Sequence, residues 1–189
     1  MGVGIFVIFI ALVVVFAVIA SGGLSSPTGT VNSIVKNQNA GNFRKVYMAL
    51  SDGGQRLWMN KLLYEVLLKS KISEEKTPSV MKVLLAHTRL KTKNIPLLVS
   101  RFRSDIRRKK EYHDIAIELA DALVADMPEK RKDLYFLPET TKVVTMDLNQ
   151  RGNRATGKIE YTLPNTEGKI SRTVRLRLMN GSWRLDRMY

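Results

Sequence analysis

The chain has 189 residues, and its 31 Lys and Arg residues outnumber its 17 Asp and Glu residues to give a formal net charge of +14. This length accommodates one domain with a terminal extension and excludes a large multidomain protein. The sequence contains no cysteine, which excludes a disulfide scaffold, a thiolate zinc site and a cysteine nucleophile.

Residues 1–20 contain no charged, amide or hydroxyl side chain. A helix of that length spans about 30 Å, which matches the hydrocarbon thickness of a bilayer. We therefore predict a transmembrane anchor over 1–20. The alternative is a secretory signal cleaved after Ala20, but the segment begins without Lys or Arg and is longer than the usual apolar core of a signal peptide.

Small residues, Gly and Pro dominate 21–30, which predicts a flexible linker. The first basic residue after the apolar segment is Lys36, followed by Arg44 and Lys45. The tendency of positive charge to stay inside then favours a single-pass protein with a cytoplasmic body. An extracytoplasmic body is the alternative, because long domains can be translocated despite their charge.

Apolar residues recur at helical spacing through 31–128. The pattern predicts two short helices over 31–50 with a break near 37–41, and a longer helix over 57–68. Further helices are predicted after Thr77-Pro78, after Asn94-Ile95-Pro96, and from about Tyr112 to Leu123. The pair Met127-Pro128 ends this helical half.

From about residue 140 the apolar period becomes two, which is typical of strands with one buried face. Four strands are predicted over 140–189, and Asn180-Gly181 is a strong signal for the final hairpin. Asp147, Glu160 and Asp186 fall on the polar side of this alternation. We therefore predict an α+β fold, in which one basic domain over 31–189 packs its helices on a four-stranded antiparallel meander.

The end of this pattern, from Ile159 through Gly181-Ser182-Trp183 to Met188, resembles the nuclear-transport-factor-two-like superfamily, which includes ketosteroid-isomerase-like enzymes. The resemblance implies amino-terminal helices folded onto a curved antiparallel sheet. Membrane-anchored members include assembly components of type IV secretion machines. The resemblance also offers an alternative function, a cone-shaped domain that binds or isomerises a small molecule, which would need an acid enclosed by the sheet.

The sequence offers no catalytic constellation. His87 and His113 lie on different predicted helices, and we expect His87 at the core boundary and His113 at the surface. We interpret Ser51-Asp52 as the end of a helical region, and no phosphate-binding loop or metal-ligand spacing is present. We therefore predict no cofactor, no metal and no enzymatic activity.

Positive charge is the most informative functional signal. The predicted binding residues form one group in the helical half and one on the strands: Arg101, Arg103, Arg107, Arg108, Lys109 and Lys110, and Arg175, Arg177 and Arg184. They predict an interaction or assembly module of a membrane complex that binds acidic protein or anionic lipid. The alternative, a membrane-tethered nucleic-acid binder, is disfavoured because few aromatic residues accompany the basic ones.

Overall fold

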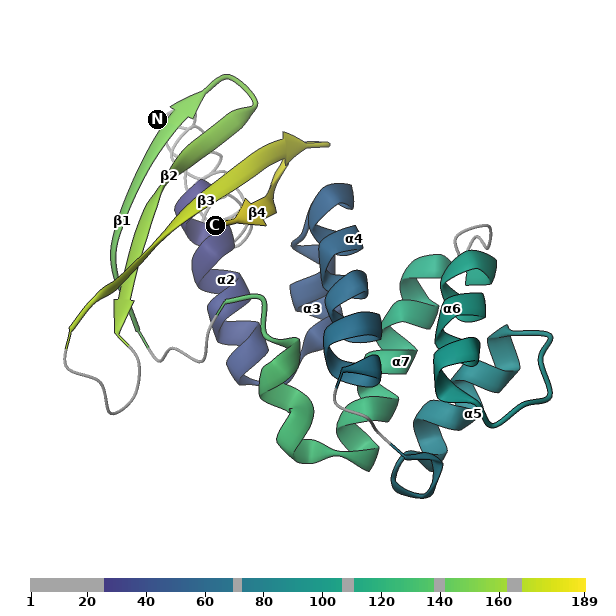
Figure 1. Cartoon of the computed structure of the whole chain (residues 1–189). Coiled ribbons are helices and arrows are strands. Elements are labelled where there is room, and N and C mark those ends of the chain that lie inside the picture. Colours follow the sequence, from purple (N-terminus) through teal and green to yellow (C-terminus); the bar gives the residue numbers. More distant parts are fainter. Residues whose placement is uncertain (1–25, 70–72, 107–110, 138–141, 163–167) are drawn as a thin grey trace, which may run out of the picture.

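The computed structural model describes residues 26–69, 73–106, 111–137, 142–162 and 168–189. It confirms the α+β class, with helices in the first part of the chain and a four-stranded antiparallel sheet at its end (Figure 1). Within these ranges no helix is both long and apolar enough to cross a bilayer. The predicted anchor over 1–20 lies outside the described residues.

Helix α2 spans Pro27–Asn39 and begins inside the predicted linker. The Ser26 hydroxyl caps it by accepting a hydrogen bond from the amide of Gly29 at 3.0 Å, and Pro27 occupies the first helical position, where its missing N–H costs nothing. Residues 27–30, expected to be linker, are therefore helical. Helix α3, Phe43–Met48, follows after the predicted break.

Helix α4 spans Asp52–Asn60 and continues directly into a π-helix, η1, over Lys61–Leu68. The sequence predicted one regular helix over 57–68. The apolar residues of η1 are nevertheless buried as expected: Leu62, Leu63, Val66 and Leu67. The apolar pattern thus identified a helix and its buried face, but not its change of hydrogen-bonding pattern.

The remaining helical elements are the short 3₁₀ turn η2, Glu74–Lys76; α5, Pro78–His87; α6, Ile95–Ile106; α7, Tyr112–Asp126; and the 3₁₀ segment η3, Pro128–Leu134. Of these elements, α5 and α6 lie farthest from the sheet, and η3 returns toward α2 (Figure 1). Helix α5 packs between α6 and α7. The starts of α5 and α6 confirm the predicted boundaries at Pro78 and at Asn94, whose side chain accepts from the Leu97 amide at 3.0 Å.

The sheet has the predicted meander order β1-β2-β3-β4. Its strands are β1, Lys142–Arg151; β2, Arg154–Thr162; β3, Ile170–Met179; and β4, Ser182–Met188. Asn180 and Gly181 have φ values of 50° and 76°, as a type I′ turn requires. Both hairpin turns, β1 to β2 and β3 to β4, lie at the same end of the sheet because the four strands are consecutive and antiparallel.

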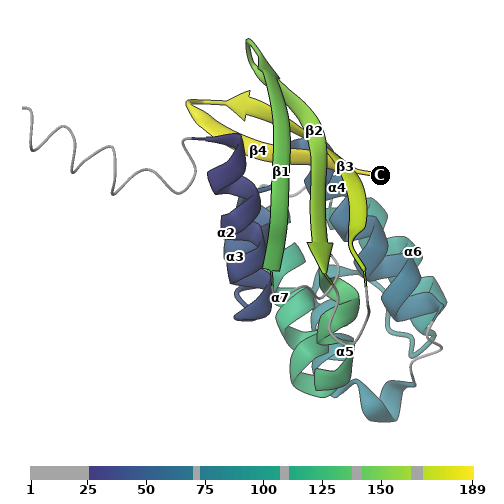
Figure 2. The ribbon, with the colours of Figure 1, turned by 90° about the vertical axis from the view of Figure 1, so that its left-hand side faces the viewer.

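Helix α2 covers one face of the sheet, in contact with β1 and β4 (Figure 2). The Thr30 hydroxyl donates to the carbonyl of Trp183 at 3.1 Å and joins the first turn of α2 to β4. Under the helices the sheet contributes a continuous apolar layer: Ala155, Ile159, Tyr161, Val174, Leu176, Trp183 and Leu185.

Residues 49–51 extend the sheet beyond β4. The Leu185 amide donates to the Ala49 carbonyl, and the Ser51 amide donates to the Leu185 carbonyl, each at 2.9 Å. Opposite this contact the β3–β4 register shifts, because Leu176 pairs with Leu185 while Arg175 pairs with Arg187. Asp186 is the extra residue of this β-bulge.

Asp186 was expected on the polar side of the sheet and outside any enclosed site, but the structure buries its side chain. Its exposed fraction is 4%. The start of α4 lies against it, so closely that a Cβ on Gly53 would stand 2.9 Å from the Asp186 Oδ1. The bulge and this helix start together enclose a carboxylate that strict alternation would have left in solvent.

Candidate functional site

Arginines occupy adjacent positions on all four strands of the sheet. In the first row, Arg151 pairs with Arg154, Arg154 with Arg177, and Arg177 with Arg184. In the second row, Thr156 pairs with Arg175, and Arg175 pairs with Arg187. We call these residues the arginine face: Arg151, Arg154, Arg175, Arg177, Arg184 and Arg187.

The arginine face lies opposite the buried layer. Ala155, Leu176 and Leu185 point into the core, and side chains of neighbouring residues in a strand alternate between the two faces of a sheet. Accordingly, Arg151, Arg154, Arg177 and Arg187 are exposed, while Arg175 and Arg184 are half-buried. The positive charges therefore gather on a solvent-facing surface at the hairpin end of the sheet.

The three predicted strand arginines also make contacts within the fold. The Arg177 Nε lies 3.4 Å from the Asp186 Oδ1, and Arg184 donates to the carbonyl of Met48, the last residue of α3, at 3.0 Å. The Arg175 guanidinium lies over the Tyr189 ring at 5.9 Å from its centroid. These contacts order the three side chains while leaving their charge on the surface.

Sequence reasoning missed the other members of the face, Arg151, Arg154 and Arg187. Among the described residues, no carboxylate forms an ion pair with any of the three. Arg154 lies four positions before Lys158 on β2, on the same face of the strand. Since Lys158 was predicted to point outward, the alternation of the sequence could have identified Arg154 as well. Arg187 could not be found this way, because the bulge at Asp186 interrupts the alternation of β4.

The basic group predicted in the helical half is only partly described. Arg101 pairs with Asp105 one turn along α6, at 3.1 Å, and Arg103 donates to the Tyr64 hydroxyl at 2.6 Å while its guanidinium lies over the Tyr64 ring. Both arginines therefore have partners within the fold. The predicted residues Arg107, Arg108, Lys109 and Lys110 lie outside the described residues.

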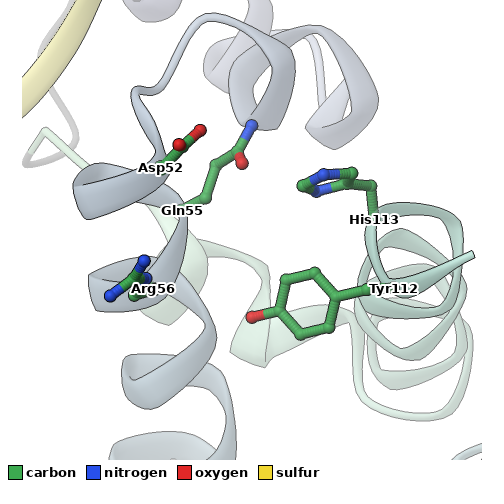
Figure 3. Close-up of a pocket in the computed structure, with 5 residues that line it drawn as sticks. All are labelled: Asp52, Gln55, Arg56, Tyr112 and His113. Atoms are coloured by element: carbon green, nitrogen blue, oxygen red, sulfur yellow. The ribbon is translucent and has the colours of Figure 1, made fainter. Parts of the chain in front are cut away.

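A pocket of about 470 Å³ opens between α4 and the start of α7, lined by Asp52, Gln55, Arg56, Tyr112 and His113 (Figure 3). Behind it, the hydroxyl of buried Tyr47 lies 3.2 Å from the His113 Nδ1. Burial, and then the neighbouring Tyr112, raise the pKa of the Tyr47 hydroxyl well above its ordinary value. Tyr47 therefore stays neutral in the folded protein at physiological pH.

The histidines lie apart, as predicted. His113 is exposed at the pocket rim, and His87 lies at the core boundary, with its Nε2 3.3 Å from Glu118 and its ring edge-on to Phe102. Among the described residues no three His, Asp or Glu side chains gather in a way that could hold a metal ion. Ser51 caps the start of α4 through the Gly54 amide at 3.1 Å, whereas the sequence predicted that a helical region ends at Ser51-Asp52.

Comparisons of the chain with protein families, with curated proteins and with solved structures find no match. The nuclear-transport-factor-two-like resemblance therefore stays a prediction, and the chemistry of the surface carries the functional argument.

Proposed function

We propose that the protein is a membrane-anchored, non-enzymatic interaction module that binds anionic surfaces, acidic protein or anionic lipid, through the arginine face of its sheet. The observation that carries this proposal is the in-register row Arg151, Arg154, Arg177 and Arg184 on the solvent side of the strands. Like charges placed directly opposite one another destabilise a sheet. Because these arginines repel one another and face solvent, the row is best explained by a negatively charged partner whose binding offsets the repulsion.

The apolar segment over 1–20 supplies the location in this proposal. A single apolar helix of this length is held in a bilayer by the hydrophobic effect and keeps the basic body beside it. The positive charge near the membrane favours a cytoplasmic body, as predicted above. As part of a larger membrane complex, the body would act by binding and positioning its partners.

The small-molecule alternative receives less support from the interior. Ile159, Tyr161, Leu176 and Trp183 occupy the covered face of the sheet. The enclosed acid that we find, Asp186, accepts a hydrogen bond from the Ser51 hydroxyl at 2.6 Å and is not among the residues that line the pocket at His113. The pocket at His113 opens between helices instead.

The test is fractionation of cells that express the full chain, followed by purification in mild detergent. We expect the chain in the membrane fraction after an alkaline wash, together with copurifying membrane proteins that the triple variant R151Q/R154Q/R187Q loses. The matched control, K82Q/R89Q/K91Q, removes the same charge from exposed residues of α5 and the loop after it. A soluble chain that begins near Ser21 would contradict the anchor, and retention of the same proteins by both variants would contradict the binding surface.

A further inference from the structure

We infer that the arginine face docks on the anionic phospholipid headgroups of the same bilayer that holds residues 1–20, with the hairpin end of the sheet against the membrane. This inference rests on the proposed function, because it takes the apolar segment to be embedded. It adds the identity of one partner and the orientation of the body.

The point where the connecting segment enters the folded domain, at the start of α2, supports this orientation. The first turn of α2 is bound to β4 by the Thr30–Trp183 hydrogen bond, and Trp183 directly precedes Arg184 in the arginine face. Figure 2 shows the start of α2 beside β4. The apolar segment therefore connects to the body at the end of the sheet that carries the arginines.

The length of the connecting chain limits how far the body can move away. Between Ala20 and Ser26 the chain can extend by at most about 20 Å, because a fully extended chain spans about 3.3–3.6 Å per residue. With the apolar segment embedded, the start of α2 stays within that distance of the headgroups. The connecting chain thus keeps the adjacent arginines close enough to reach the membrane surface, where anionic lipid attracts basic groups within about one Debye length.

The composition of the face also favours headgroups over nucleic acid. The second row continues from Arg175 to the short polar residues Thr156 and Asn149, and the ring of Tyr189 lies under Arg175. Non-specific single-strand binders place several aromatic rings where bases can stack. A tyrosine beside a row of arginines suits the interface between headgroups and water.

A proximity measurement on the full chain tests the inference. Because the sequence has no cysteine, Thr156→Cys gives a single attachment point for a donor dye in the middle of the face. Ala86→Cys places the same dye at an exposed position on α5, far from the sheet (Figure 1). Each labelled chain is reconstituted into vesicles of phosphatidylcholine, with or without phosphatidylglycerol, that carry an energy acceptor on the headgroups.

The inference expects strong energy transfer from position 156 in the vesicles that contain phosphatidylglycerol, and a decrease of that transfer at high salt or in neutral vesicles. Transfer from position 86 should stay low throughout. R151Q/R154Q/R187Q should reduce the transfer from position 156 to its level in neutral vesicles, while K82Q/R89Q/K91Q should retain it. A cooperative thermal transition, with a midpoint no lower than that of the unchanged chain, shows that both variants are folded.

The two proposals can fail separately. If an alkaline wash leaves the chain in the vesicles but transfer from position 156 does not depend on anionic lipid, the anchor stands and the lipid docking is overturned. If the wash releases the chain, the anchor is overturned, and salt-sensitive transfer measured before the wash still supports docking on lipid. If DNA at low salt abolishes the transfer while lipid remains in excess, nucleic acid is the preferred ligand and the lipid assignment is overturned.

Discussion

The Ser51 hydroxyl donates to the buried carboxylate of Asp186 at 2.6 Å, across 135 positions of the sequence. The same hydroxyl oxygen accepts from the Gly54 amide and caps α4. One serine thus joins the start of a helix to the bulge of the last strand. The positive end of the α4 backbone lies beside the Asp186 carboxylate, which is a favourable arrangement for a negative charge.

We expect Ser51→Ala to lower the free energy of unfolding by about 1–3 kcal/mol, because it removes a helix cap and leaves a buried carboxylate with one hydrogen bond fewer. Chemical denaturation of the full chain in detergent measures the effect. Ser171→Ala, on an exposed position of β3, is the control and should change stability by less than about 0.5 kcal/mol. Equal effects of the two substitutions would show that the Ser51–Asp186 contact contributes little.

Gly157 is the position in the sheet that tolerates a side chain least. A Cβ there would overlap the backbone carbonyl of Asp147 on β1, so the close approach of the two strands requires glycine. Gly157→Ala should therefore separate β1 from β2 locally and destabilise the protein by more than about 2 kcal/mol. Hydrogen exchange of the β1 amides measures this, with Thr156→Ala as the neighbouring control. Unchanged protection would mean that β1 can shift to accommodate the methyl group.

Local signals in the sequence predicted much of the fold. Pro78 and Asn180-Gly181 act within a few residues, through the geometry of a helix start and of a two-residue turn, so their predictions hold. Alternation likewise placed Arg175, Arg177 and Arg184 on the outer face. In each case the decisive physics lies between neighbours in the chain.

The features that sequence reasoning missed depend on contacts distant in the chain. Asp186 is buried because the Ser51 region lies against β4, and no pattern within β4 reports that contact. The bulge that follows from this packing also conceals the pairing of Arg187 with Arg175. The rows of the arginine face become visible only when strand register is known, since register brings together residues that the sequence spaces unevenly.

The raised pKa of Tyr47 predicts a loss of stability in alkali. Above its ordinary pKa of 10.0, the Tyr47 hydroxyl loses its proton in the unfolded chain but keeps it in the folded one. The folded state then binds more protons, so the free energy of unfolding falls as the pH rises above 10. Unfolding curves at pH 9 and pH 11 should show a smaller decrease for Tyr47→Phe than for the unchanged chain. Equal decreases would show that Tyr47 ionises alike in both states.

Because the arginines of the arginine face repel one another, a substitution that relieves this repulsion should stabilise the fold while it weakens binding to anionic lipid. Arg154 lies between Arg151 and Arg177 in the first row, so Arg154→Glu replaces two repulsive neighbours by two attractive ones. Cross-strand charge pairs contribute roughly 0.2–1 kcal/mol each. We therefore expect Arg154→Glu to raise the free energy of unfolding by about 1 kcal/mol while it weakens energy transfer from position 156 to anionic vesicles.

Lys158 provides a control of opposite sign on the same strand. It pairs with Asp147 on β1, so Lys158→Glu changes the charge by the same amount but creates a repulsive pair. Thermal unfolding at low ionic strength should therefore separate the two variants, with Arg154→Glu above the unchanged chain and Lys158→Glu below it, and added salt should reduce the difference. A destabilised Arg154→Glu would show that the arginines do not repel one another in the folded protein. The stability argument for a negatively charged partner would then fail, because the row would carry no energetic cost for such a partner to offset.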